Sequence, residues 1–129
     1  MTLRTIEWKN NSVIMIDQTK LPNNLEFVTY DNFNQVAEAI RTLVVRGAPA
    51  IGVSAAFGLA LAALQSNAEE KDELIQDLEN AKKILIETRP TAVNLSWGLK
   101  KIMDIAKQGK TVSEIRDTVI AKAKQMAEE

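Results

Sequence analysis

The 129-residue chain contains no cysteine and no histidine. Their absence excludes a disulfide framework, a Cys/His zinc site, a thiol nucleophile and an imidazole base within this chain. Acid–base chemistry would therefore fall to Asp, Glu, Lys or Tyr. Basic residues are not in excess either, because 16 Lys and Arg are balanced by 17 Asp and Glu, which leaves a net charge of −1. This balance argues against nucleic-acid binding, which needs clustered positive charge.

A stretch without any charge, residues 47–68, raises the question of a membrane span. It is dominated by alanine, which contributes little to membrane insertion, and it is interrupted by Gly52, Ser54 and Gly58. We therefore expect a buried helix here and no membrane span. The opening residues Met1–Lys9 are polar and lack the apolar segment of a signal peptide, so we expect a cytoplasmic protein.

Residues 1–30 are expected to form strands. Thr5–Lys9 and Ser12–Asp17 are rich in Ile, Val, Trp and Thr, and Leu25–Tyr30 is a third candidate strand. Asn10 and Asn11 lie between the first two strands. Because Asn tolerates the left-handed conformation, this pair predicts a hairpin turn.

Residues 31–129 are expected to form five helices, because their apolar residues recur at helical spacing. Caps and breakers set the limits: Asp31 or Asn32 before the first helix, Pro49 in the first turn of the second, Gly109 after the fourth, and a Thr111–Glu114 capping box at the fifth. The expected helices cover roughly residues 32–45, 49–66, 69–87, 93–107 and 111–129. The fold class is α+β, with about three antiparallel strands followed by a five-helix bundle in one domain.

Two segments place an arginine just before a helix start. The first is Val45–Gly52, which reads VRGAPAIG. A helix amino terminus has unpaired N–H groups and a partial positive charge, so it suits an anion. Gly47 and Ala48 allow close approach of the backbone, and Arg46 adds a planar donor fork for phosphate oxygens. The alternative is an ordinary interhelical turn with a surface arginine.

The second segment is Thr88–Leu95, which reads TRPTAVNL. Pro90 stiffens the loop and would aim Arg89 at low entropic cost. The alternative is that Thr91 is only an N-cap and that Arg89 caps the carbonyls of the preceding helix. Together, the two arginines are expected to converge on one phosphate. Trp97, on the following helix, is expected to lie in the core or at an interface.

These two motifs resemble those of the methylthioribose-1-phosphate isomerases. VRGAPAIG, continued as VSAAFGLALAA, and TRPTAVNLSWGL at Thr88–Leu99 carry the resemblance. This family shares a superfamily with the regulatory subunits of translation initiation factor 2B and with ribose-1,5-bisphosphate isomerases. Segments Pro49–Gly52 and Asn94–Trp97 resemble the methylthioribose branch.

The resemblance implies that this chain is the amino-terminal domain of an enzyme that converts 5-methylthioribose 1-phosphate to the corresponding ketose in methionine salvage. It implies phosphate binding by Arg46, Gly47, Ala48 and Arg89, no metal or organic cofactor, and homodimers formed through a second, Rossmann-like domain. The catalytic Cys and Asp of the family come from that second domain. Because the chain has no Cys and ends at Glu129 without a helix stop signal, we expect a truncated or domain fragment that is inactive alone and has its C-terminal domain or chain as partner.

Two other functions stay open. One is a regulatory or assembly module like the amino-terminal domains of the initiation-factor subunits, and the other is a ribose-1,5-bisphosphate isomerase-like role. A structural helical domain without a ligand is the third possibility.

Overall fold

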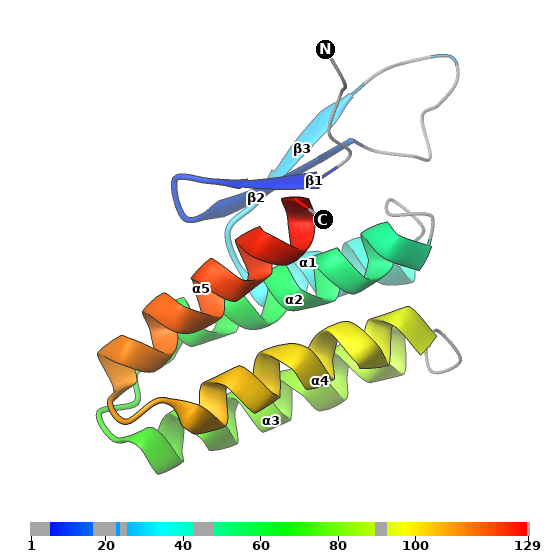
Figure 1. The fold of residues 1–129 in the computed structure, drawn as a ribbon. Helices are drawn as coiled ribbons and strands as arrows, with labels where there is room; N and C mark the ends of the chain where they lie inside the picture. The colour runs from blue at the N-terminus through cyan, green and yellow to red at the C-terminus, as the bar shows by residue number, and fades with distance from the viewer. Residues whose placement is uncertain (1–5, 17–22, 24–25, 43–47, 90–92, 129) are drawn as a thin grey trace.

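A computed structural model describes residues 6–16, 23, 26–42, 48–89 and 93–128 of the chain. Three strands, β1 (Ile6–Lys9), β2 (Ser12–Ile16) and β3 (Phe27–Tyr30), precede five helices. The helices are α1 (Phe33–Arg41), α2 (Ala48–Gln65), α3 (Lys71–Thr88), α4 (Val93–Gln108) and α5 (Val112–Glu128). The expected α+β fold is confirmed: the strands form a layer on one side of a helical bundle (Figure 1).

The sheet is antiparallel with the strand order β1-β2-β3. Asn10 and Asn11 form the β1–β2 turn with φ values of 54° and 60°, as the hairpin prediction required. The register pairs Trp8 with Val13, and Val13 in turn with Tyr30. Trp8 also reaches the bundle, because its ring centroid lies 5.6 Å from that of Phe57 on α2. The sheet is thus attached to the central helix through an aromatic contact.

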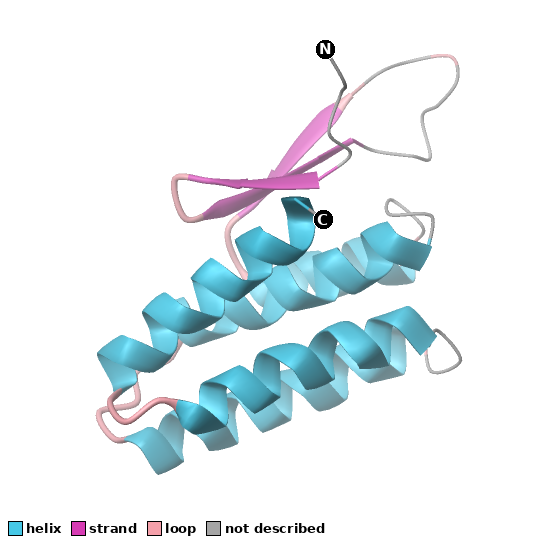
Figure 2. Cartoon of the chain, viewed as in Figure 1, coloured by secondary structure: helices cyan, strands magenta, loops and turns pink. Residues whose placement is uncertain are grey.

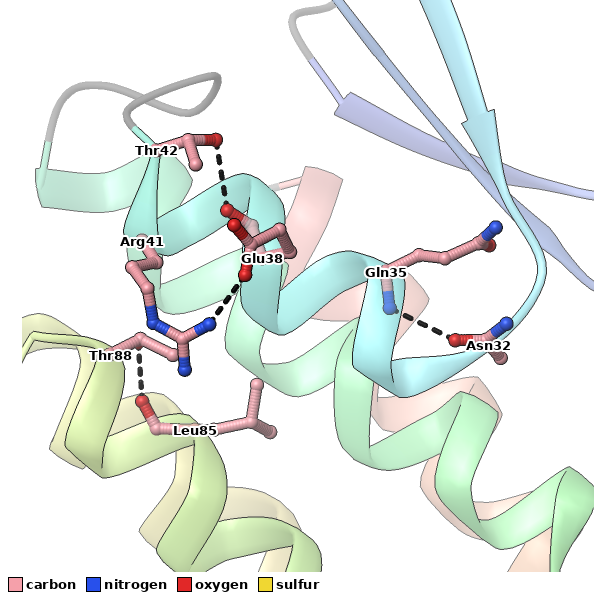
Figure 3. Close-up of polar contacts among 7 residues, drawn as sticks. All are labelled: Asn32, Gln35, Glu38, Arg41, Thr42, Leu85 and Thr88. Atoms are coloured by element: carbon pink, nitrogen blue, oxygen red, sulfur yellow. Dashed lines mark hydrogen bonds and ion pairs between the residues drawn. The ribbon is translucent and has the colours of Figure 1, made fainter.

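Helix α1 begins as predicted and ends earlier than predicted. The side chain of Asn32 accepts a hydrogen bond from the Gln35 N–H at 2.9 Å and caps the helix (Figure 3). The helix ends at Arg41, not near Val45. The backbone of Thr42 leaves the helical region at ψ 8°, and its hydroxyl donates to the Glu38 carbonyl at 2.9 Å. A threonine that bonds back to this carbonyl competes with further helix growth.

Helix α2 is the centre of the bundle and contacts the other four helices as well as β1. Ala55, Phe57, Leu59 and Ala63 are fully inaccessible to solvent, which agrees with the prediction of an enclosed apolar helix. Within the described parts of the chain, no helix is long and apolar enough to cross a bilayer. Figure 2 shows the helices arranged as a bundle with the hairpin and β3 stacked above it.

The turn between α4 and α5 follows the predicted stop and start signals. Gly109 is buried, and its N–H donates to the Ala106 carbonyl at 3.2 Å. The hydroxyl of Thr111 accepts from the Glu114 N–H at 3.1 Å, which is the first half of the expected capping box. The Glu114 carboxylate reaches the N–H of Lys110, at 3.3 Å, one residue before the position that a regular capping box uses.

Candidate functional site

Helices α2 and α4 begin next to each other. Gly52 lies four residues after the first residue of α2, and Asn94 is the second residue of α4. A Cβ atom added at Gly52 would lie 2.9 Å from the Asn94 carbonyl oxygen. Figure 1 shows both helices starting at the same end of the bundle, on the right of the view. Their unpaired N–H groups and the positive ends of their dipoles therefore share one end of the molecule.

A second glycine makes this contact closer still. A Cβ atom added at Gly98 would lie 2.5 Å from the Gly52 carbonyl oxygen and 3.3 Å from its Cα. No side chain fits between backbones at such a distance, so both positions need glycine. Gly58, the other glycine of α2, also permits close helix packing, but of a different kind. Gly52 meets the backbone of α4, whereas Gly58 meets the methyl groups of Leu85 and Val36 at 3.3 to 3.4 Å.

Arg89 directly follows α3, and α4 begins four residues later, at Val93. Its backbone has φ −150° and ψ 78°, and its N–H donates to the Ile86 carbonyl at 3.2 Å. The Thr88 hydroxyl donates to the Leu85 carbonyl at 2.5 Å (Figure 3). These two bonds satisfy two carbonyls of the last turn of α3 without the Arg89 guanidinium. The Arg89 side chain is half-buried, and it is not needed to cap the carbonyls of Leu85 and Ile86.

The other predicted site residues are only partly placed. Arg46 and Gly47 lie outside the described residues, as do Pro90 and Thr91 of the second motif. Ala48 is described as the first residue of α2, through its backbone alone. The convergence of Arg46 and Arg89 on one anion therefore stays a prediction. The structure shows that α2 and α4, the helices that follow these arginines in the sequence, start next to each other.

At the opposite end of α2, an arginine holds the helix carbonyls in a way that the sequence analysis missed. Arg116 on α5 donates from Nε to the Ala63 carbonyl at 2.7 Å and from Nη2 to the Ser66 carbonyl at 2.5 Å. The carboxyl end of α4 also accepts a hydrogen bond from a cation on another helix, since Nζ of Lys71 donates to the Lys107 carbonyl at 2.8 Å. Helix α2 has no basic residue in its last turn. In the sequence, this lack is the signal that a cation from elsewhere in the chain could stabilise the negative end of the helix dipole.

Trp97 does not lie in the core, contrary to one of the two expectations for it. Its side chain is 48% exposed on α4, and Nζ of Lys101 lies 4.2 Å from its ring centroid. One turn of helix separates it from Val93, which is 79% exposed. Trp97 lies off the buried face of α4, which follows the apolar period of the sequence and consists of Leu95, Gly98, Leu99, Ile102, Met103 and Ala106. An interface role for Trp97 stays a prediction.

A hollow of about 260 Å³ lies elsewhere, between the start of α1, the end of α2 and α3. Its lining includes Phe33, Ser66, Asp77 and Asn80. Three of its polar side chains already have hydrogen-bond partners, since the Ser66 hydroxyl donates to Asp77 at 2.5 Å and Asn80 accepts from Gln76 at 3.1 Å. Across the described part of the chain, no three acidic side chains gather as a metal site requires.

Comparison with known proteins identifies the family to which the chain belongs. Residues 44–129 match the family described as Initiation factor 2 subunit family. A methylthioribose-1-phosphate isomerase of Citrifermentans bemidjiense is 49% identical over 125 residues, which are 95% of this chain and 36% of that relative. A methylthioribose-1-phosphate isomerase of Nostoc punctiforme is 43% identical over 129 residues, again 95% of this chain and 36% of the relative.

Two crystal structures share the fold closely. A 5-methylthioribose 1-phosphate isomerase from Pyrococcus horikoshii OT3 aligns with a TM-score of 0.92 and 43% identity, over 98% of this chain and 36% of that one. Subunit delta of the translation initiation factor eIF-2B from A. fulgidus aligns with a TM-score of 0.92 and 41% identity, over 98% of this chain and 37% of that one. The chain thus spans little more than a third of the length of the relatives that it matches.

Proposed function

Because the chain belongs to the initiation factor 2 subunit family, and a relative that is 49% identical over 95% of its length is a methylthioribose-1-phosphate isomerase, we propose that it supplies the substrate-phosphate site of such an isomerase. The reaction is the conversion of an aldose phosphate to a ketose phosphate. A place in methionine salvage and a cytoplasmic location are part of this proposal and rest on the resemblance alone.

One observation carries the proposal: α2 and α4 start side by side, in contact through Gly52 and Asn94. A phosphate has several oxygens to satisfy, and one helix terminus offers donors from only one direction. Two adjacent termini offer N–H groups from two directions and add their positive dipole ends. We propose that the backbone of Gly47 and Ala48 and the start of α4 act on the same anion.

The two arginines complete the proposed site. Arg46 precedes α2 by two residues and Arg89 precedes α4 by four, so each arginine lies shortly before the start of its helix in the sequence. A guanidinium can bond two oxygens of one phosphate in a planar, bidentate geometry. Arg89 is half-buried, which reduces solvent screening of its charge.

This site alone does not perform the isomerisation. The family resemblance places the reacting Cys and Asp in a second domain, and this chain contains no Cys. A site that only half encloses the phosphate is also open to water, which screens the contacts with the arginines. We expect the 129-residue chain to bind phosphate with a dissociation constant on the order of millimolar, which is roughly −4 kcal/mol. A submicromolar value in calorimetry is incompatible with a half-site.

The test is isomerase activity in a protein of the relatives' full length that contains this chain. Replacing Arg46 or Arg89 by Ala should lower kcat/KM by about tenfold to a hundredfold, because each change removes hydrogen bonds between charged groups. Arg41→Ala is the matched control, since Arg41 is exposed and paired with Glu38 on α1. Activity that is unchanged in both the Arg46 and Arg89 variants rules out the site.

A second function is favoured by one comparison. The A. fulgidus structure described as an initiation factor subunit aligns as well as the isomerase structure does, at nearly the same identity. A regulatory or assembly module would keep the fold and lack turnover. The full-length protein distinguishes the two, because a module binds its partner and converts neither methylthioribose 1-phosphate nor ribose 1,5-bisphosphate. Pro49–Gly52 and Asn94–Trp97, which resemble the methylthioribose branch, favour the enzyme.

A further inference from the structure

We propose that Gly52 and Gly98 are positioning residues, which set the separation of the two helix starts so that one phosphate can bond to both. This inference rests on the proposed phosphate site and goes one step further, since neither glycine touches the anion. Gly52 and Gly98 are buried and clearly allow α2 and α4 to pack closely. The inference adds that this packing determines the affinity for the ligand.

The two glycines lie close to the helix starts that they would control. Gly52 is four residues after Ala48 and Gly98 is five after Val93, which places the contact about 6 to 8 Å along each helix from its first residue. A change in helix separation at this contact is therefore transmitted to the helix starts almost undiminished, because a helix is stiff over one or two turns.

The atoms that a side chain would meet here cannot yield by rotating. At Gly98 the neighbour is the Gly52 carbonyl oxygen at 2.5 Å, and at Gly52 it is the Asn94 carbonyl oxygen at 2.9 Å. Ordinary contact begins at 3.4 Å, so a Cβ at Gly98 moves one backbone by about 1 Å. Charge-assisted hydrogen bonds are made at about 2.7 to 2.9 Å. A displacement of that size leaves the phosphate bonded to one helix and too far from the other.

Two other glycines are matched controls, because they also pack tightly without joining α2 to α4. A Cβ at Gly58 would meet the methyl groups of Leu85 on α3 at 3.3 and 3.4 Å. A Cβ at Gly109 would meet Cγ1 of Ile115 at 2.5 Å, beyond the far end of α4. Both replacements strain side chains and lower stability, and both leave the spacing of the helix starts as it is.

The experiment is a titration of the 129-residue chain with inorganic phosphate, followed by amide NMR at constant ionic strength and well below each variant's Tm. Sodium chloride at the same ionic strength controls for general salt effects. In the unmodified chain, phosphate should shift the amides of Ala48 and Ala50 on α2 and of Val93 and Asn94 on α4 with one common dissociation constant. Shifts on only one of the two helices contradict the inference.

Gly98→Ala and Gly52→Ala should weaken phosphate binding by about tenfold or more, while Gly58→Ala and Gly109→Ala change it less than twofold. If all four variants lose affinity in proportion to their loss in Tm, the glycines are merely structural and the inference is wrong. If Gly98→Ala does not fold, the milder Gly52→Ala and the two-helix shift pattern of the unmodified chain decide. If Arg46→Ala and Arg89→Ala leave phosphate affinity unchanged, the proposed function itself fails, whatever the glycine variants do.

Discussion

Removal of the Arg116 side chain tests whether α5 holds the carboxyl end of the central helix. The Arg116 guanidinium is half-buried and donates to the carbonyls of Ala63 and Ser66, at 2.7 and 2.5 Å. Helix α2 has no basic residue in its last turn. Arg116 therefore satisfies backbone acceptors that the helix itself leaves unpaired, and it places a positive charge at the negative end of the helix dipole.

The magnitude follows from the two bonds. A hydrogen bond to a charged group stabilises a protein by about 1.5 to 3 kcal/mol, and water replaces part of that here because the side chain is partly exposed. We expect Arg116→Ala to lower the free energy of unfolding by about 2 to 3 kcal/mol in total. For a chain of this size, that corresponds to a fall in Tm of roughly 10 °C.

Urea denaturation followed by circular dichroism measures the effect, and two variants separate its causes. Arg116→Met keeps the apolar stem and removes both bonds, so it should lose nearly as much stability as Arg116→Ala. Lys124→Ala on the same helix is exposed and controls for the loss of one positive charge. If Arg116→Ala lies within about 0.5 kcal/mol of Lys124→Ala, the reasoning about carbonyl capping is refuted.

Two further stability changes can be measured in the same way. Asn11→Val should destabilise the chain by about 1 to 2 kcal/mol, because Asn11 has φ 60°, whereas Asn11→Gly should be close to neutral; equal losses in both variants contradict this. Trp97→Ala should cost less than about 1 kcal/mol, since the ring is 48% exposed and its cation–π contact with Lys101 is on the surface. Phe57→Ala in the core should cost about 3 to 5 kcal/mol, and similar losses at Trp97 and Phe57 would show that Trp97 is buried in solution.

Most of the fold was predictable because its signals are local. The Asn10-Asn11 turn, the Asn32 cap and the stop at Gly109 are each defined by a few neighbouring residues with one preferred conformation. The end of α1 was not predictable at the same level. Its apolar period continues past Arg41, whereas in the structure the Thr42 backbone leaves the helical region and the Thr42 hydroxyl bonds to the Glu38 carbonyl.

The sequence predicted two phosphate-binding segments and their convergence on one anion, but it did not show which contacts bring the two helix starts together. Each arginine precedes a helix, which the sequence shows directly. That the two helices start together depends on Gly52 and Gly98, which are 46 positions apart in the sequence and can be paired only in three dimensions. The Arg116 contact with Ser66 is non-local in the same sense, since it joins residues 50 positions apart.

The two ends of the bundle differ in a way that bears on ligand binding. Helices α2 and α4 run in the same direction and touch near their starts, so their dipoles are aligned and repel each other. At the carboxyl end, Arg116 and Lys71 from neighbouring helices bond to carbonyls in the last turns of α2 and α4 and offset the negative charge. The starts of α2 and α4 lie at the end of the bundle where α1 and α3 have their carboxyl ends, and Arg89 adds a positive charge there. An anion bound between the two helix starts would offset the repulsion between their positive ends, which is the physical reason to expect phosphate at the contact of α2 and α4.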